Sequence, residues 1–370
     1  MVNFKDNGIN TQHMQRAIEL AKNGIGFVNP NPLVGAVIVK DGNIIGEGYH
    51  AKYGDLHAER NAFKFCDENN IDCTSATMYV TLEPCCHHGK QPPCTEAIVE
   101  HGISKVIIGS RDPNPLVSGK GVEYLRNHGV EVITDYMRDE CDKLNDIFFH
   151  YITTNKPYVI LKTAMTLDGK IASYSGKSQW ISCEKSREHT HLTRKRVSAI
   201  MVGLGTVLAD NPMLNCRVEN PSHPIRIVCD SNLNIPLGCK LVTTAIDIPT
   251  YVATISNDVK RISELEDLGV RVLKTSSKDG KVNLNELMNI LGSLKIDSLL
   301  IEGGAELNFS ALESNIVDCV QIYLSPMILG GKDAKTPVGG LGFENPDLAK
   351  RFKLVKNTTI GSDLFLEYKR

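Results

Sequence analysis

The feature that most limits the fold of this chain is an alternation of short apolar runs with longer amphipathic segments, which occurs twice along its 370 residues. Runs such as VGAVIV at 34–39, ATMYVTL at 76–82 and KVIIG at 105–109 are short and rich in β-branched residues, so they predict strands. The segments between them carry apolar residues at helical spacing, with capping residues and glycines at their ends. This alternation predicts an α/β fold.

The first series covers about 140 residues and predicts the order αββαβαβαβ. A helix around 10–24 places Met14, Ala17, Ile18 and Ala21 on one face, and a second helix begins near His57. A hairpin follows from the DG turn between VGAVIV and NIIGEG. The remaining expected elements are strands at 76–82, 105–109 and 130–133 and helices at 94–102 and 119–128. Together they predict a three-layer α/β domain.

The pattern restarts around YITTNKPYVI, where Pro157 precedes a new strand, YVILKTAMT. We place the domain boundary near residue 150, giving domains 1–150 and 151–370, because 370 residues exceed the usual size of one hydrophobic core. The second series predicts a second α/β domain with strands near 197–202, 225–229, 249–254, 270–273, 297–301 and 318–324.

Charge and composition restrict the partners that we expect. A net charge of −2 provides no polybasic field, so we expect no nucleic acid partner. No apolar segment reaches the ~20 residues that span a bilayer, and MVNFKDNGIN does not begin as a secretory signal, so we expect no membrane partner. Eleven scattered cysteines favour reduced thiols in a cytoplasmic protein, with some binding metal.

The segment PCCHHGKQPPC at 84–94 has the greatest concentration of metal ligands. Together with HAE at 57–59 it approaches the zinc-deaminase signature H-x-E…P-C-x-x-C, in which His57 and Cys85 are ligands. The last cysteine departs from that signature, since eight residues rather than two separate Cys85 from Cys94. Cys94 opens a predicted helix, and a helix N-terminus favours the thiolate that a metal requires.

One nitrogen and two sulfur ligands leave the fourth tetrahedral position open to water, which is the catalytic arrangement of zinc. Zinc lowers the pKa of such a water towards ~7, and Glu59 is the carboxylate that would carry its proton to the departing ammonia. A fourth ligand from Cys86, His87 or His88 would close the site instead. The alternative is then a structural zinc module, in which Glu59 has no role.

Motifs along nearly the whole chain resemble the bifunctional riboflavin-biosynthesis deaminase–reductase family. They are NPNPLVGAVIV, HAE, PCCHHGKQPPC and RDPNPLVSGKG, then LKTAMTLDGKIA, SQWIS, GLGTVLADNPMLNCR and IEGGAEL. The resemblance implies a cytidine-deaminase-like α/β/α domain followed by a dihydrofolate-reductase-like α/β domain. It also implies Zn²⁺ and NADPH as cofactors. The expected substrate is a phosphorylated ribosylaminopyrimidine, which loses its 2-amino group by hydrolysis and then has its ribosyl side chain reduced to ribityl.

The resemblance further implies the residues of both sites. In the first domain Asn31 and His50 would contact the base, and Lys90, Asp112 and Asn114 the ribose or phosphate. In the second domain the expected cofactor residues are Ala164, Trp180, Thr206, Asp210, Ser231 and Gly304. The expected substrate residues are Lys162, Ser178, Ser182, Arg194, Leu214, Arg217 and Glu302. Arg194 and Arg217 suit a phosphate, because guanidinium matches phosphate oxygens bidentately.

The second domain has no G-x-G-x-x-G followed by a suitably spaced acidic residue, so a Rossmann site is not supported. The family's reductase binds NADPH without that fingerprint. Glu59, Lys162 and Asp210 are our catalytic candidates, with Glu302 a further ionisable group whose role the sequence does not separate from theirs. A single-activity deaminase whose second domain only binds is the enzymatic alternative. We expect a homo-oligomer.

Overall fold

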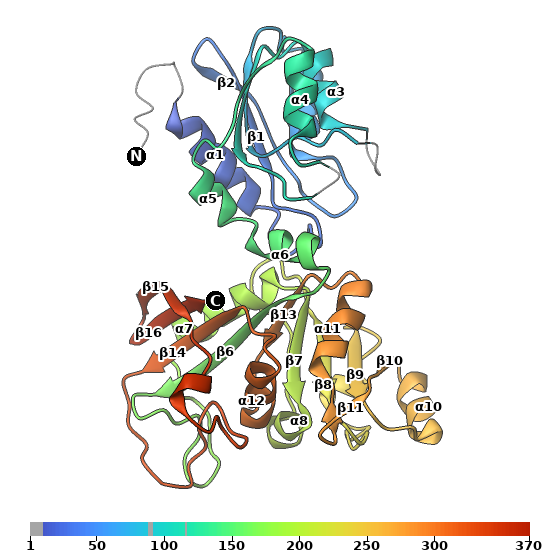
Figure 1. Ribbon diagram of the computed structural model, residues 1–370, viewed down its shortest axis with the longest axis vertical. Coiled ribbons are helices and arrows are strands. Elements are labelled where there is room, and N and C mark those ends of the chain that lie inside the picture. The colour runs from blue at the N-terminus through green and yellow to red at the C-terminus, as the bar shows by residue number, and fades with distance from the viewer. Residues whose placement is uncertain (1–9, 88–91, 115–116) are drawn as a thin grey trace. The chain divides into compact units, whose positions relative to one another are not determined.

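The computed structural model describes residues 10–87, 92–114 and 117–370. The chain forms two compact units, Met1–Thr154 and Asn155–Arg370 (Figure 1). Residue 150, near which the sequence placed the boundary, lies in helix α6 (Asp146–Thr154), the last element of the first unit. Ile147 and Phe148 of this helix are buried.

The first unit is built on a five-stranded sheet in the order β2-β1-β3-β4-β5. Strand β1 (Gly35–Lys40) is antiparallel to β2 (Asn43–Tyr49) and β3 (Thr77–Leu82), and β3 is parallel to β4 (Lys105–Ser110), which is parallel to β5 (Glu131–Ile133). The helices are α1 (Thr11–Lys22), α2 (Ala58–Glu68), α3 (Cys94–Glu100), α4 (Lys120–Asn127) and α5 (Arg138–Asp142). The predicted order αββαβαβαβ is confirmed over α1 to β5.

Helices cover both faces of this sheet, because alternate strand residues point to opposite sides. Ile38 and Met78 pack with residues of α2, α3 and α4, whereas Val37 and Tyr79 pack with α1 and α5. Figure 1 shows α3 and α4 on one side of the strands and α1 and α5 on the other. The predicted three-layer domain is confirmed.

Helix α2 lies unusually close to β2, and glycine makes this possible. A Cβ atom on Gly48 would lie 2.3 Å from the backbone oxygen of Ala58, and one on Gly46 would lie 2.5 Å from Sγ of Cys66. Ala58 is the first residue of α2. The absence of side chains at Gly46 and Gly48 therefore allows α2 to pack directly against β2.

The second unit has a nine-stranded sheet in the order β10-β9-β8-β7-β13-β6-β14-β16-β15. The strands from β10 to β14 in this order are parallel, β16 is antiparallel to β14, and β15 is antiparallel to β16. The strands are β6 (Tyr158–Thr166), β7 (Ala199–Gly203), β8 (Ile225–Cys229), β9 (Thr250–Thr254), β10 (Val270–Lys274), β13 (Ser298–Ile301), β14 (Cys319–Ser325), β15 (Lys353–Ile360) and β16 (Asp363–Lys369). A separate two-stranded ribbon joins β11 (Ser277–Lys278) to β12 (Lys281–Val282).

The helices of this unit are α7 (Glu184–Arg196), α8 (Leu204–Asp210), α9 (Lys240–Thr243), α10 (Val259–Asp267), α11 (Leu284–Ser293), α12 (Ala305–Glu313) and the 3₁₀ turn η1 (Pro346–Leu348). Leu287 of α11 and Ala311 of α12 pack on Leu161, Met201 and other strand residues. The predicted strands are confirmed, but the sequence did not predict β15 and β16. Seven of the eight residues of β15 are exposed, so it lacks the apolar pattern by which strands are recognised.

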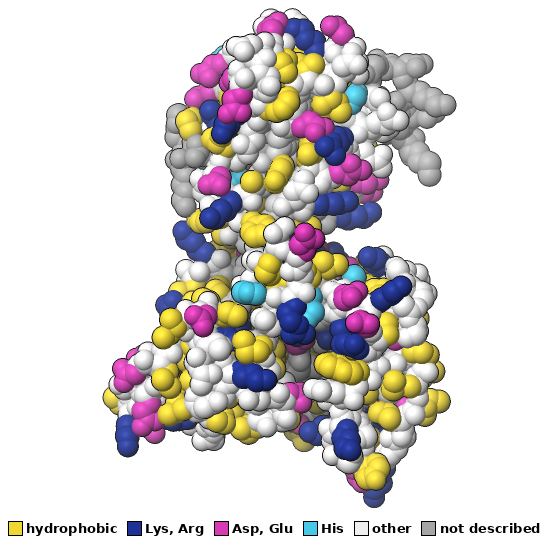
Figure 2. All heavy atoms as spheres, turned by 180° about the vertical axis from the view of Figure 1, so that it is seen from behind, with side chains coloured by type: hydrophobic (Ala, Val, Ile, Leu, Met, Phe, Trp, Pro, Cys, Tyr) yellow, Lys and Arg dark blue, Asp and Glu magenta, His cyan; other side chains and the backbone are white. Residues whose placement is uncertain are grey.

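Figure 2 shows acidic and basic side chains interspersed over the visible face of each unit. Within the described ranges, no helix combines the length and the apolar character needed to cross a membrane.

Candidate active sites

The predicted metal ligands of the first unit meet at the ends of three elements. His57 is the residue before α2, Cys85 follows β3, and Cys94 is the first residue of α3. Nδ1 of His57 lies 3.5 Å from Sγ of Cys85 and 3.4 Å from Sγ of Cys94. All three ligand atoms lie within 4.8 Å of one another.

These distances fit a tetrahedral zinc ion. With ordinary Zn–S and Zn–N bond lengths, nitrogen and sulfur ligands of one ion lie roughly 3.6 Å apart. The two thiols titrate as a pair, since the hydrogen bond between them lowers the pKa of Cys85 and raises that of Cys94. The backbone N–H of Cys94 also donates to Sγ of Cys85 at 3.4 Å. The site is therefore prepared to hold at least one thiolate.

Within the described part of the chain, the cluster with metal-binding geometry consists of these three residues. Cys86 and His87, which the sequence left open as a fourth ligand, lie outside that cluster. His88, the remaining alternative, falls outside the described residues. The described residues thus supply three ligands and leave the fourth tetrahedral position to water, which is the arrangement of a catalytic site rather than a structural one.

Glu59 lies in the first turn of α2, two residues after His57. Its side chain is buried, with 3% exposure, and it lines the same cavity as His57 and Cys85. Burial raises the pKa of Glu59, and the charge of Cys85 raises it further. A carboxyl group with a raised pKa beside a metal site can both accept and return a proton.

Asn31 and His50 form one wall of this cavity. Nδ1 of His50 donates to the backbone oxygen of Leu56 at 3.0 Å, which leaves Nε2 to accept from Nδ2 of Asn31 at 3.1 Å. Burial lowers the pKa of His50, which favours the neutral ring. The pair presents a fixed polar surface to a ligand.

Asn145 is a buried residue that the sequence analysis missed. Its side chain accepts from the N–H of Leu33 at 2.8 Å and donates to the oxygen of the same residue at 2.9 Å. It thereby holds the loop that carries Asn31, although 112 residues separate the two partners. No local pattern could have revealed this contact.

Asp112 and Asn114 lie at the end of β4 and also line the cavity. Oδ1 of Asp112 accepts the N–H of Asn114 at 2.8 Å. Burial raises the pKa of Asp112 to about 6, and the nearby charge of Glu83 adds to this. Lys90, which the sequence assigned to the same group, lies outside the described residues.

The cavity of the first unit has a volume of about 330 Å³, which suits a small-molecule ligand. Seven predicted residues line it: Asn31, His50, His57, Glu59, Cys85, Asp112 and Asn114. Cys94 belongs to the same site through its contact with His57. Tyr53, Glu83 and Tyr151 line it as well and were not predicted.

The second unit has a cavity of about 560 Å³ at the carboxyl ends of its parallel strands. This is where ligands bind in open α/β sheets. Gly203 and Gly304, which precede α8 and α12, are among the residues that line it. Five predicted residues line this cavity: Ser178, Thr206, Asp210, Ser231 and Gly304.

A second group of predicted residues gathers around the buried carboxylate of Glu302. Nε and Nη2 of Arg194 donate to it at 2.7 and 3.0 Å, and Nζ of Lys162 lies 3.6 Å away. Burial alone would raise the pKa of Glu302, but the charges of Arg194 and Lys162 outweigh it and lower the pKa to about 2. These three residues are therefore charged partners rather than separate surface groups.

Other predicted residues lie beside these two groups. Arg217 donates to Oδ1 of Asn215 at 3.2 Å, and Arg194 donates to the backbone oxygen of the same residue at 2.9 Å. Leu214 is buried next to it. Trp180 is 63% exposed and stacks against Arg187, whose guanidinium lies 4.5 Å from the ring centre and donates to the oxygen of Ser182. Ala164 and Trp180 do not line the 560 Å³ cavity.

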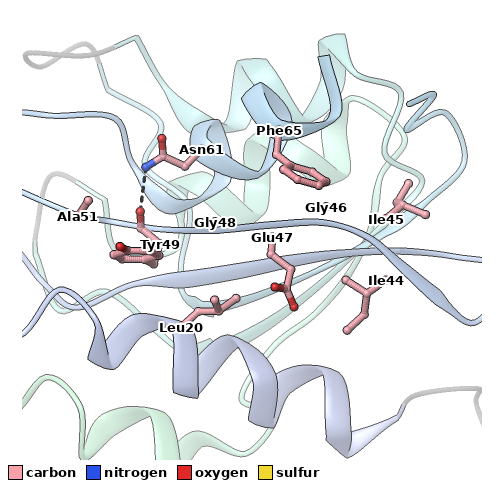
Figure 3. A pocket seen from close by; sticks show the side chains of 10 residues that line it. All are labelled: Leu20, Ile44, Ile45, Gly46, Glu47, Gly48, Tyr49, Ala51, Asn61 and Phe65. Atoms are coloured by element: carbon pink, nitrogen blue, oxygen red, sulfur yellow. Dashed lines mark hydrogen bonds between the residues drawn. The ribbon is translucent and has the colours of Figure 1, made fainter. Parts of the chain in front are cut away.

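A further cavity of about 560 Å³ runs along the edge strand β2 (Figure 3). Ile44 and Leu20 lie on one side of the strand in that view and Phe65 of α2 on the other. Glu47, the one carboxylate among its lining residues, is bound to Arg16 at 2.7 Å. The lining supplies neither a metal ligand cluster nor a free acid, so we assign it no chemistry.

Two family descriptions match the chain. Residues 8–110 match the cytidine and deoxycytidylate deaminase zinc-binding region, and residues 157–366 match the RibD C-terminal domain.

Relatives match the chain over nearly its whole length. The riboflavin biosynthesis protein RibD of Actinobacillus pleuropneumoniae is 55% identical, covering 96% of this chain and 94% of that protein. A solved structure from Thermotoga maritima, described as a diaminohydroxyphosphoribosylaminopyrimidine deaminase/5-amino-6-(5-phosphoribosylamino)uracil reductase, is 40% identical with a TM-score of 0.86, covering 97% of each chain. A structure of Acinetobacter baumannii RibD is 37% identical with a TM-score of 0.85, covering 97% of this chain and 98% of the other.

Proposed function

This chain belongs to the family of the riboflavin biosynthesis protein RibD, and from that premise we propose that its two units catalyse two consecutive reactions. The first is the hydrolytic deamination of 2,5-diamino-6-ribosylamino-4(3H)-pyrimidinone 5′-phosphate. The second is the reduction of 5-amino-6-(5-phosphoribosylamino)uracil at its ribosyl side chain. We assign the deaminase to residues 1–150 and the reductase to residues 151–370.

We propose that His57, Cys85 and Cys94 hold zinc in the first reaction. Zinc, when bound, makes a water molecule acidic enough to attack at neutral pH. Glu59 takes a proton and delivers it to the leaving amino group, a role for which its buried, raised-pKa carboxyl group is suited. Asn31 and His50 orient the pyrimidine ring by hydrogen bonds, which brings the amino-bearing carbon to the reacting position.

The other end of the deaminase site recognises the sugar phosphate in this proposal. Asp112 and Asn114 bind ribose or phosphate oxygens, and Lys90 supplies a positive charge for the phosphate. The position of the first two along the wall of the 330 Å³ cavity supports this assignment. The role of Lys90 rests on the sequence alone.

We propose that NADPH occupies the 560 Å³ cavity of the second unit, where it supplies the hydride. Glycines at the starts of α8 and α12 let a diphosphate approach the backbone, and α12 offers free N–H groups for it. Thr206, Asp210, Ser231 and Gly304 form the lining that would hold the cofactor. Ala164 and Trp180 are also expected to contact NADPH, although neither lines this cavity.

Glu302, with its charged partners Arg194 and Lys162, forms the proposed substrate side of the reductase. Lys162 is its proton-donating candidate and is held in place by Glu302 at 3.6 Å. Ser182, Leu214 and Arg217 belong to the same expected surface, and Ser178, also expected on the substrate side, lines the cavity assigned to NADPH. Asp210 is exposed at the end of α8, on the cofactor side of the cavity, which favours a cofactor contact over a catalytic one.

The observation that carries the proposal is the combination, in one chain, of a three-residue cluster with metal-binding geometry beside a buried glutamate and a separate cavity at the carboxyl ends of parallel strands. The test is to incubate the protein with the diaminopyrimidinone and NADPH while recording ammonia release and NADPH oxidation. We expect ammonia first and NADPH oxidation after it. Ammonia release without NADPH oxidation would contradict the second half and favour a single-activity deaminase.

We also propose a cytoplasmic homo-oligomer. The zinc site needs reduced thiols at Cys85 and Cys94, which a reducing compartment maintains. Strand β15 is an edge strand on which Leu354 and Val355 are half-exposed, and such edges pair readily with another chain. Light scattering after size-exclusion chromatography tests the assembly, and a mass equal to one chain would contradict it.

A further inference from the structure

One lysine in the second unit has a position that suits selection between dinucleotides. Of the described residues that line the 560 Å³ cavity, two are cationic, Lys281 and Lys335. Lys281 lies in β12, and its Nζ is 3.4 Å from Oε2 of Glu306 in α12. The two lysines would meet different ends of a bound dinucleotide.

The strand order sets the direction of the cofactor. The proposed substrate groups, Lys162 and Glu302, belong to β6 and to the end of β13, which are neighbouring strands. The reactive ring of a nicotinamide must touch the substrate, so that half of the cofactor lies at the β6 and β13 side. The adenosine half must then extend along the sheet edge towards β7 and β8.

The distance along the edge is sufficient for this arrangement. Strand β8 is two strands from β13 and three from β6, which corresponds to roughly 10 and 14 Å at ordinary strand spacing. Ser231 follows β8, and β12, which carries Lys281, contacts β9 next to it. The far end of the cavity is therefore lined by Ser231, Lys281 and the apolar residues Val282 and Leu284.

Lys335 lies at the opposite end. Its backbone oxygen accepts the N–H of Ile171 at 2.9 Å, and Ile171 belongs to the loop that follows β6. It is thus on the nicotinamide side, away from the adenosine ribose. Among the described residues that line the cavity, this leaves Lys281 as the cation at the adenosine end.

The existing partner of Lys281 does not prevent it from binding a phosphate. The side chains of Lys281 and Glu306 are 59% and 69% exposed, and ion pairs this exposed are weak. A phosphate dianion offers more charge and more acceptor oxygens than one carboxylate. Exchange of one partner for the other therefore costs little.

We propose that Lys281 binds the 2′-phosphate of NADPH and makes the reductase select the phosphorylated dinucleotide over NADH. The proposal rests on the cofactor site assigned under the proposed function. It adds a residue and a physical reason for the selection, because NADH carries a neutral hydroxyl group where NADPH carries this phosphate.

The test measures dissociation constants for NADPH and NADH by isothermal titration calorimetry, with no catalytic turnover. Lys281→Met is expected to weaken NADPH binding by at least about tenfold and to leave NADH binding within about twofold. Lys281→Arg is expected to retain the preference. Lys278, paired with Lys281 in the same ribbon but absent from the cavity lining, is the matched control, and Lys278→Met should change neither constant.

The compound 2′,5′-ADP provides an independent measurement, since it carries the 2′-phosphate without the nicotinamide. Its affinity should fall in Lys281→Met and persist in Lys335→Met. Equal weakening of NADPH and NADH in Lys281→Met, or loss of the preference in Lys335→Met alone, would overturn the proposal. Wild-type protein that binds NADPH and NADH equally would also overturn it while leaving the reductase assignment intact. If the protein bound neither dinucleotide, the proposed cofactor site would be wrong, and this inference would fail with it.

Discussion

Arg194 and Glu302 form a bidentate ion pair, with Nε and Nη2 of the arginine 2.7 and 3.0 Å from the two carboxylate oxygens. Both side chains are largely buried, at 13% and 9% exposure. The sequence suggested Arg194 as a phosphate ligand. In the structure its guanidinium is engaged by Glu302 and by the backbone of Asn215, so it keeps the carboxylate of Glu302 charged.

This pair predicts a cost for losing the carboxylate charge. Glu302→Gln leaves Arg194 and Lys162 as buried cations without their counter-ion, so we expect the second unit to lose about 3–5 kcal/mol of stability. Thermal unfolding should show the loss, and NADPH oxidation should fall while ammonia release continues. Glu306→Gln, which alters an exposed carboxylate on the neighbouring helix, should leave stability nearly unchanged.

The same ion pair predicts that the protein loses folding stability in acid. A folded-state pKa of about 2, against an ordinary 4.5, corresponds to about 3 kcal/mol of stability. That contribution is complete above the ordinary pKa and is lost as pH falls through 4.5 towards 2. Chemical denaturation at pH 7 and pH 3 should show that the wild type loses this stability in acid. An equally large loss in Glu302→Gln would show that ionised Glu302 is not its origin.

Glu59→Gln separates the two reactions. The variant keeps the shape of the side chain but cannot accept a proton, so we expect ammonia release to fall about 10²–10⁴-fold. Zinc content should remain near that of the wild type, and NADPH oxidation should proceed on substrate that has already been deaminated. Unchanged ammonia release would support the structural zinc module instead.

Cys94 and Cys86, which lie inside and outside the proposed ligand cluster, provide a matched test of the zinc ligands. Cys94→Ser removes a sulfur ligand whose Sγ lies 3.4 Å from Nδ1 of His57, so bound zinc and ammonia release should both be lost. Cys86→Ser alters a cysteine outside the cluster and should retain about one zinc ion per chain. Zinc content measured by mass spectrometry decides between them, and zinc loss in Cys86→Ser would add that residue to the ligand set.

Asp112 predicts a pH dependence of substrate binding by the deaminase. Its pKa is raised to about 6, so it is ionised above that pH and becomes protonated below it. If the ionised form accepts hydrogen bonds from the ribose, binding should be about tenfold weaker at pH 5 than at pH 7.5. Asp112→Asn should bind weakly at both values. A wild-type KM that does not change over this range would exclude the role.

Gly48 connects the fold to the zinc site. A methyl group there would meet the backbone of Ala58 at 2.3 Å, which would displace the start of α2 with His57 and Glu59. We expect Gly48→Ala to destabilise the first unit by about 1–3 kcal/mol and to weaken zinc binding. Gly238→Ala, at a position with open space around it, should do neither. Thermal unfolding with zinc titration measures both effects.

Much of the first site could be predicted because its signals are local. His57 and Glu59 are two residues apart, and Cys94 opens a helix that its own neighbours predict. The contact between Asn145 and Leu33 could not be predicted, since 112 residues separate them and asparagine before a helix ordinarily indicates only a cap. Strand β15 was missed for the opposite reason, because its exposed residues form no pattern.

The sequence by itself determined the order of helices and strands in the first unit, the presence of two α/β domains and the choice of His57, Cys85 and Cys94 as candidate metal ligands. These follow from periodicity, capping and motif spacing, which act over a few residues. The tertiary structure alone decided which charges are paired. It joined Arg194 to Glu302 across 108 residues and brought Lys281 to Glu306 in the lining of a cavity. Electrostatic partners depend on distance in space and on burial, and neither is a property of the local sequence.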